Sequence, residues 1–130
     1  MTYLLDSNAV IAFQKGDRGM EAFLRNLGRE QAFISSVILH ELYFGAFKSS
    51  RIEDNLRNIR DLPFQSFDFA GEDARLAARI RDDLRRRGMP IGPYDMLIAG
   101  QALARDLTLV TRNAREFARV EGLRVEDWER

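Results

Sequence analysis

TYLLDSN, at residues 2–8, is a short apolar run that ends in an acid and two small polar residues. The run is too short to classify by its periodicity, but this ending is typical of a buried strand that meets the start of a helix. A second such run, Ala32–Ile34, is closed by Ser35 and Ser36, which can cap the helix that follows. The sequence therefore predicts two βα junctions.

The rest of the chain alternates in the same way between helical spacing and short apolar runs. We expect strands at about 2–5, 32–34, 64–69, 107–111 and 123–125, and helices at about 7–13, 20–27, 37–48, 52–62, 71–87, 94–105 and 114–119. Trp128 is expected to pack the tail against the body. Strands separated by helices imply right-handed crossovers and a mostly parallel sheet covered on both faces. We predict one α/β domain over residues 1–130, with three α/β/α layers.

The composition excludes several kinds of protein. The chain has no cysteine, which removes thiolate nucleophiles, cysteine zinc sites and disulfides, and suits a reducing compartment. The first ten residues lack the pattern of a secretion signal, and no apolar run approaches the roughly 20 residues that span a bilayer. We therefore expect a cytoplasmic protein with no membrane contact.

The 20 basic and 20 acidic side chains cancel, so no global field would draw the protein onto nucleic acid. Any nucleic-acid contact has to use local patches. One basic stretch contains Arg75, Arg79, Arg81, Arg85, Arg86 and Arg87. Because Asp82 and Asp83 interrupt it, we interpret this stretch as a solvated helix face.

Two polar positions follow predicted strands, at the sheet edge where open parallel sheets bind ligands. Asp6 follows the first strand, and Asn113 follows the strand at 107–111. Asp6 could equally serve as the N-cap of the first helix, which would stabilise it by about 1 kcal/mol. Position therefore makes both residues candidates without deciding their role.

Glu41 lies inside a predicted helix, and its neighbours one turn away are apolar or small. A buried, unpaired carboxylate is costly, so a cation should face it, either a metal ion or an arginine. The adjacent His40 should point about 100° away and is expected to be a packed or surface residue.

Two further acids have local explanations. Asp95 lies two residues after Pro93, where a carboxylate suits the positive end of a helix. Glu116 lies three residues after Asn113, which is the spacing of a capping box. Neither acid alone indicates catalysis.

Taken together, four segments resemble the PIN-domain nucleases in order and spacing over nearly the whole chain. They are LLDSN at residues 4–8, SVILHE at 36–41, IGPYDMLIA at 91–99 and LVTRNAREF at 109–117. The resemblance is greatest to the VapC group, the ribonuclease toxins of bacterial toxin–antitoxin pairs, whose ending also looks like residues 122–128. Members often have Asn where Tyr94 stands and Thr where Ser7 stands, so substrate contacts beside Asp95 are expected to differ.

The resemblance implies roles for particular residues. It implies that Asp6, Glu41 and Asp95 ligate a metal ion, that Glu116 completes the acidic cluster, that Asn8 and Asn113 orient it, and that Thr111 adds a supporting hydroxyl. Clustered carboxylates repel one another unless a divalent cation neutralises them, and oxygen-only sites favour Mg²⁺ or Mn²⁺. RNA contacts are expected at Lys48, Tyr94, Arg112 and Arg115, the basic and aromatic residues nearest the acids in sequence.

The expected function is a Mg²⁺- or Mn²⁺-dependent endoribonuclease. Resemblance alone implies a toxin role, a cognate antitoxin partner and a homodimer, and it does not identify the RNA. One alternative is a catalytically silent PIN-fold module that binds RNA or protein. Another is an aspartate-dependent phosphatase, but that class needs a second Asp two residues after the first, where this chain has Asn8.

Overall fold

A single five-stranded sheet forms the centre of the protein, in the order β3-β2-β1-β4-β5. The computed structural model describes residues 1–129, apart from the side chain of Arg29. The strands are β1 (Tyr3–Leu5), β2 (Ala32–Ser35), β3 (Gln65–Phe67), β4 (Thr108–Val110) and β5 (Arg124–Glu126). Every strand pair is parallel, which confirms the predicted α/β class.

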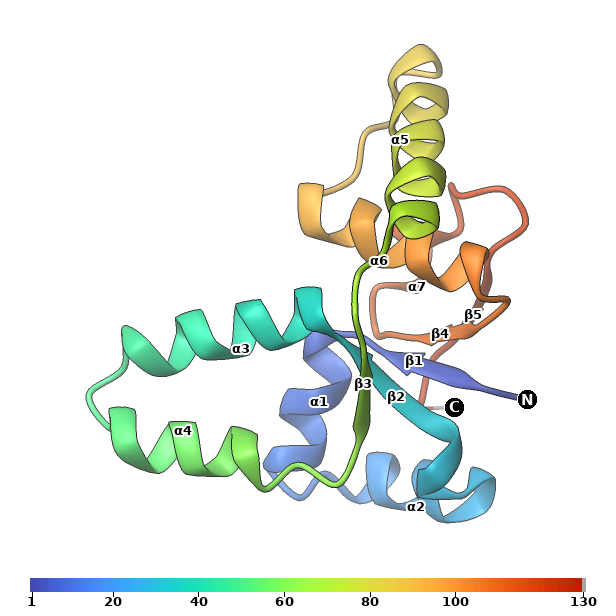
Figure 1. Cartoon of the computed structure of the whole chain (residues 1–130). Helices are drawn as coiled ribbons and strands as arrows, with labels where there is room; N and C mark the ends of the chain where they lie inside the picture. Colours follow the sequence, from blue (N-terminus) through green and yellow to red (C-terminus); the bar gives the residue numbers. More distant parts are fainter. Residues whose placement is uncertain (130) are drawn as a thin grey trace.

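Helices connect the strands and cover both faces of the sheet (Figure 1). They are α1 (Ser7–Gln14), α2 (Arg18–Leu27), α3 (Ser36–Phe47), α4 (Ile52–Arg60), α5 (Gly71–Arg86), α6 (Pro93–Ala104) and α7 (Ala114–Phe117), with a short 3₁₀ turn, η1 (Arg29–Gln31). In Figure 1, α1 and α2 lie on one side of the strands, and α5, α6 and α7 lie on the other. The three-layer prediction is therefore confirmed. Within residues 1–129, no helix has the length and apolar character needed to cross a membrane.

Several predicted boundaries were wrong, most clearly at β3. We expected a strand over 64–69, but β3 covers only Gln65–Phe67. It is an edge strand that pairs with β2 alone. The carbonyl of Asp68 accepts hydrogen bonds from the side chains of Gln101 and Arg105, at 3.1 and 2.7 Å, rather than from a strand. Side chains from the end of α6 and from its C-cap residue thus take the place of a strand partner after β3. Smaller shifts occur at α7, which ends at Phe117, and at η1, which was not predicted.

The middle of the sheet is the apolar core. Leu4 and Leu5 of β1 are fully buried, as are Leu109 and Val110 of β4. The predicted packing of the tail is also confirmed, because Trp128 is buried and its indole N–H donates to Asp17 Oδ2 at 3.2 Å. The two central strands therefore have fixed carboxyl ends from which polar side chains can project.

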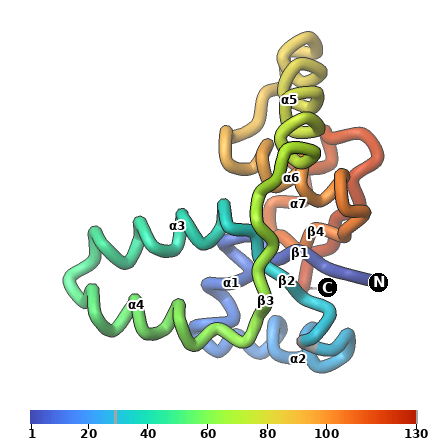
Figure 2. Tube along the Cα trace, in the orientation of Figure 1, coloured from blue at the N-terminus to red at the C-terminus, as the bar shows by residue number. Residues whose placement is uncertain are grey.

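The pair α3 and α4 extends from the sheet as an antiparallel arm, which the trace in Figure 2 shows clearly. Ser35 caps α3 by accepting the N–H of Val37, at 3.0 Å. Ser36 instead accepts the N–H of Phe69 and so ties the start of the arm to the segment after β3. Large apolar side chains are exposed on the arm, including Phe44 at 61% and Phe47 at 60%.

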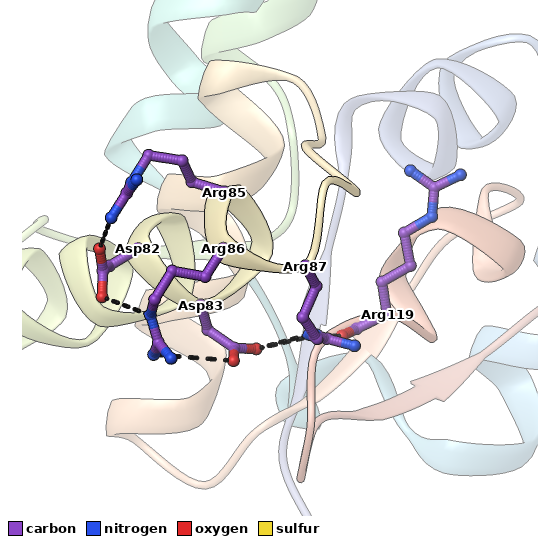
Figure 3. Close-up of polar contacts among 6 residues, drawn as sticks. All are labelled: Asp82, Asp83, Arg85, Arg86, Arg87 and Arg119. Atoms are coloured by element: carbon purple, nitrogen blue, oxygen red, sulfur yellow. Dashed lines mark hydrogen bonds and ion pairs between the residues drawn. The ribbon is translucent and has the colours of Figure 1, made fainter.

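The arginine-rich stretch lies along α5, and its side chains are largely paired within their own helix (Figure 3). Asp82 accepts from Arg85 and Arg86, at 2.7 and 3.0 Å, and Asp83 accepts from Arg87 at 2.8 Å. Such exposed ion pairs contribute little to stability, because water screens them. These contacts support the interpretation of this stretch as a solvated helix face.

Helices α5 and α6 cross at unusually short range. The backbone of Gly100 lies so close to α5 that an added Cβ would be 2.5 Å from the nitrogen of Ala77 and 2.6 Å from its Cα. Both residues are buried. Only glycine fits at this crossing. The close contact with α5 fixes the position of α6, and therefore the position of its first turn at the edge of the sheet.

A buried carboxylate that we did not predict joins the same two helices. Asp73 of α5 is 1% exposed and accepts hydrogen bonds from the N–H of Ala70 at 2.8 Å, Gln101 at 3.2 Å and Arg105 at 3.0 Å. Burial alone would raise the pKa of Asp73, but the hydrogen bonds from Arg105 and Ala70 and the charge of Arg105 outweigh it, and the pKa is lowered.

Asp73→Asn should therefore lower the free energy of unfolding at pH 7 by about 2 kcal/mol, because hydrogen bonds to a charged group are lost. A lowered folded-state pKa adds stability above the unfolded pKa, near 4, and this stability is lost as the pH falls through the folded-state value. Urea unfolding at pH 7 and pH 3 should show the difference from wild type shrinking at the lower pH. Asp82→Asn, exposed on the same helix, is the control and should change little. An equal loss of unfolding free energy at pH 7 and pH 3 would contradict the stabilising role of the charged Asp73 carboxylate.

Candidate active site

Asp6 is held at the carboxyl edge of the two central strands. Its backbone N–H donates to the carbonyl of Val110 at 3.1 Å, and its Oδ1 accepts the N–H of Ala9 at 2.9 Å, so Asp6 is the N-cap of α1. Its other oxygen accepts a hydrogen bond from the hydroxyl of Thr111, directly after β4. One carboxylate oxygen of Asp6 is therefore used in capping the helix, and the other is held in place by Thr111.

The pKa of Asp6 is raised, although several groups favour its charged form. Burial is the largest cause. The hydroxyl of Thr111, the backbone N–H groups of Ala9 and Asn8, and the charge of Arg112 act in the opposite direction without cancelling it. A buried carboxylate in this condition gains stability when a cation binds beside it.

Glu116 joins the edge through Asn113. The hydroxyl of Thr111 accepts the backbone N–H of Asn113 at 2.9 Å, and the amide of Asn113 donates to Glu116 Oε2 at 2.9 Å. The capping box predicted from the spacing does not form, because the Asn113 side chain bonds the Glu116 carboxylate rather than a backbone N–H. The two side chains thus hold each other beside Asp6.

Asp95 lies in the first turn of α6, three residues after the N-cap Gly92. Its carboxylate is turned back over that glycine, with Oδ2 only 3.3 Å from the place that a Cβ on Gly92 would take. The pKa of Asp95 is raised by burial first, and then by the negative charges of Glu116 and Asp6. Three acids from different elements therefore repel one another at this edge.

Glu41, on α3, faces the same acids. Burial raises the pKa of Glu41, the charges of Asp95 and Asp6 raise it further, and His40 lowers it in part. The prediction of an arginine or metal partner assumed that Glu41 is fully buried. This assumption was wrong, because the side chain is only half-buried. Glu41 lies near other acids, and within residues 1–129 no lysine or arginine forms an ion pair with it.

The four carboxylates form an electrostatic cluster, defined by Asp6, Glu41, Asp95 and Glu116. Across the part of the chain that the structure describes, no three acidic or histidine side chains converge closely enough to hold a metal ion as they lie. The donor set nevertheless consists of carboxylate oxygens, the ligands that Mg²⁺ and Mn²⁺ prefer. The residues thus fit such a cation in the chemistry of their donor atoms.

The other predicted site residues lie around this cluster with different surroundings. Asn8 is exposed, and no hydrogen bond of its side chain occurs within residues 1–129. Arg112 is engaged by the tail, since it pairs with Glu129 and lies 4.9 Å from the ring centroid of Trp128. Arg115 is exposed, and Lys48 lies over the ring of Phe44. Of the basic candidates, Arg112 is thus the least available to a ligand.

Two clefts open on either side of Glu41, and sequence reasoning found neither. One, which we call the ring cleft, is lined by His40, Glu41, Phe44, Gly45, Lys48 and Tyr94 and measures about 480 Å³. The other, of about 360 Å³, lies between α1, α3 and α4 and shares Glu41 and Gly45 with the first. His40 was set aside in the sequence, but its ring lies 5.4 Å from that of Tyr94. The ring cleft is formed by residues of α3 and by Tyr94 of α6. These residues are far apart in the sequence, so no local sequence pattern could have revealed the cleft.

Comparison with known proteins gives a consistent picture. Residues 3–123 match the family described as PIN domain. The chain is 41% identical to the tRNA(fMet)-specific endonuclease VapC of Shigella flexneri, over 98% of both chains, and 34% identical to ribonuclease VapC2 of Rickettsia felis, over all of both. Its fold matches a chain in the crystal structure of DNA-bound VapBC from Salmonella typhimurium, with a TM-score of 0.91, 37% identity and 98% of each chain covered. It also matches VapBC2 from Rickettsia felis, bound to a promoter DNA fragment, with a TM-score of 0.93, 32% identity, and 98% and 99% covered.

Proposed function

Because this chain belongs to the PIN domain family, we propose that it is an endoribonuclease whose acidic cluster holds Mg²⁺ or Mn²⁺ at the point of RNA cleavage. One observation carries the proposal. Asp6, Glu41 and Asp95 come from separate elements, yet the charge of Asp6 raises the pKa of both other acids, and the charge of Asp95 raises the pKa of Glu41, at a single edge of the sheet. Several relatives, named ribonucleases or endonucleases, align over nearly their whole length.

The protein's own groups have distinct tasks in this reaction. Asp6, Asp95 and Glu41 would hold the cation, and Glu116 would complete the cluster. When bound, the cation would lower the pKa of a water molecule and offset the charge that develops on the phosphate. Thr111 fixes the Asp6 carboxylate, and Asn113 fixes that of Glu116, so neither acid has to be ordered during the reaction. No side chain needs to act as a covalent nucleophile.

We further propose that the protein is the toxin of a toxin–antitoxin pair and has a cognate antitoxin as its partner. Support comes from the VapBC complexes whose chains match it over nearly their full length. A homodimer remains an expectation from the family, and a cytoplasmic location remains an expectation from the composition. Since the Shigella flexneri relative is named tRNA(fMet)-specific, tRNA(fMet) is the first RNA to test.

Removal of divalent cations should abolish RNA cleavage. With purified protein and tRNA(fMet), excess EDTA should reduce cleavage to the level of a no-enzyme control, and Mg²⁺ or Mn²⁺ should restore it, because uncompensated carboxylates repel the phosphate. The melting temperature should rise when the cation is added, since ligands that bind only the folded state stabilise it. Undiminished cleavage in EDTA would refute the metal site, and hydrolysis of p-nitrophenyl phosphate would favour a phosphatase.

A further inference from the structure

The ring cleft beside Glu41 has a composition that the acid cluster does not require. Its lining contains three rings, His40, Phe44 and Tyr94, and one cation, Lys48. His40, Phe44 and Lys48 follow one another at four-residue spacing on α3, so they share a face of that helix. Tyr94 comes from the start of α6 and closes the cleft from the other side.

The rings of the cleft are open to solvent rather than packed. Phe44 is 61% exposed and Tyr94 is 44% exposed. The ammonium of Lys48 lies 5.1 Å from the ring centroid of Phe44. Gly45, between them in the lining, would meet nothing within 4 Å if it carried a Cβ. The cleft thus has flat apolar faces, a nearby positive charge and free space.

This combination matches the chemistry of an unpaired nucleotide. Proteins that bind single-stranded RNA stack its bases on aromatic side chains and place cations at its phosphates. The second cleft beside Glu41 is lined by aliphatic side chains, amides and Lys15, without an aromatic ring. Because Glu41 lines the ring cleft, an occupant of that cleft lies next to the acids.

We propose that the ring cleft binds one unpaired nucleobase of the RNA beside the cleaved phosphodiester, stacked on Phe44 and Tyr94, with Lys48 at a neighbouring phosphate. The inference rests on the proposed function and extends it. If the cleft binds an unpaired base, the RNA must be single-stranded where it is cut, in a loop or at an end. The residues of the arm, rather than the acids, would then select the position of the cut.

Equilibrium binding of a labelled single-stranded RNA oligomer that spans the mapped cut tests this assignment. In an Asp95→Asn background, which prevents cleavage, Phe44→Ala and Tyr94→Ala should each raise Kd about tenfold, or about 1.4 kcal/mol, the size of one lost stacking contact. In the cleaving enzyme, the same changes should raise KM more than they lower kcat. Phe47→Ala removes an equally exposed ring from the same helix, outside the cleft, and should leave Kd and KM unchanged.

A second kind of variant fills the cleft instead of removing a ring. It is needed because the loss of a ring could also disturb the structure of the arm. Gly45→Leu keeps every ring and adds a side chain at a position that lines the ring cleft and the second cleft and has open space around it, so it should also raise Kd about tenfold. An oligomer with one abasic nucleotide beside the cut lacks both stacking contacts, so it should bind wild type at least about tenfold more weakly. On this oligomer, Tyr94→Ala should weaken binding no further, because the stacked base is already absent.

The outcomes separate this inference from the proposed function. Normal cleavage with Kd unchanged in both Gly45→Leu and Tyr94→Ala would overturn the nucleobase site alone and favour a protein segment as the occupant. Absence of cleavage together with ring-dependent RNA binding would overturn the nuclease and keep the nucleobase site. Absence of any RNA binding would overturn both.

Discussion

Asp95→Asn is expected to reduce RNA cleavage by more than about a hundredfold, since loss even of groups that only support a metal ligand costs 10–100-fold. The substitution keeps the size of the side chain and removes only its charge, so the cluster loses a ligand and α6 keeps its first turn. Initial rates on a mapped RNA substrate at saturating Mg²⁺ give the measurement. Asp6→Asn should have an equal effect, because Thr111 holds that carboxylate at the same edge.

The same variant should be at least as stable as wild type without metal. The pKa of Asp95 is raised by burial and by Glu116 and Asp6, so its charge is unfavourable in the folded protein at neutral pH. Thermal melts in EDTA should show an equal or higher melting temperature for Asp95→Asn, while added Mg²⁺ should stabilise wild type more. A variant that is inactive because it is unfolded would leave the catalytic role without support, and a folded variant with full cleavage would exclude it.

Gly100→Ala is expected to disrupt the fold, with a loss of about 4 kcal/mol in the free energy of unfolding. Adding a methylene to a packed core typically costs about 1–3 kcal/mol. Here the new Cβ would lie 2.5 Å from the backbone nitrogen of Ala77, which cannot rotate away as a flexible side chain could. Helices α5 and α6 would have to separate, and losses above about 4 kcal/mol are exceptional and diagnostic. Urea unfolding and the soluble yield provide the measurement.

Gly45→Ala is the matched control for this prediction. Gly45 is also a helical glycine, but its Cβ would meet nothing within 4 Å. Alanine is favoured over glycine in a helix by roughly 0.5–1 kcal/mol, so this variant should be slightly more stable than wild type. If Gly100→Ala behaved like Gly45→Ala, the close crossing of α5 and α6 would be wrong.

Much of the fold could be predicted because the strong signals are local. The apolar run before Asp6 and the serines after Ile34 mark βα junctions that need no distant information. The network around Asp73 could not be predicted, because its donors Gln101 and Arg105 lie 28 and 32 residues away. The close approach at Gly100 was missed for the same reason, since a glycine inside a helix has no local signature of the helix that crosses it.

The site shows the same division between local and distant information. The sequence offered a helix cap as one of two roles for Asp6, and Asp6 does cap α1, whereas its bond to Thr111 depends on the pairing of β1 with β4. The spacing of Asn113 and Glu116 predicted a capping box, but the side chains bond each other instead. Glu41 was expected to be buried because its helix is apolar, but it is only half-buried. The resemblance brought these residues together where spacing alone could not.

The bond between Asp6 and Thr111 can form only late in the synthesis of the chain. The two residues are 105 positions apart, and Tyr3 of the central strand pairs with Thr108. A ribosome that adds about 5–20 residues per second needs roughly 5–20 s between these codons. Throughout that time the nascent chain has β1 without one of its two neighbours and Asp6 without its hydroxyl partner. Shortened products of interrupted translation that end before Thr111 would therefore lack the nuclease edge.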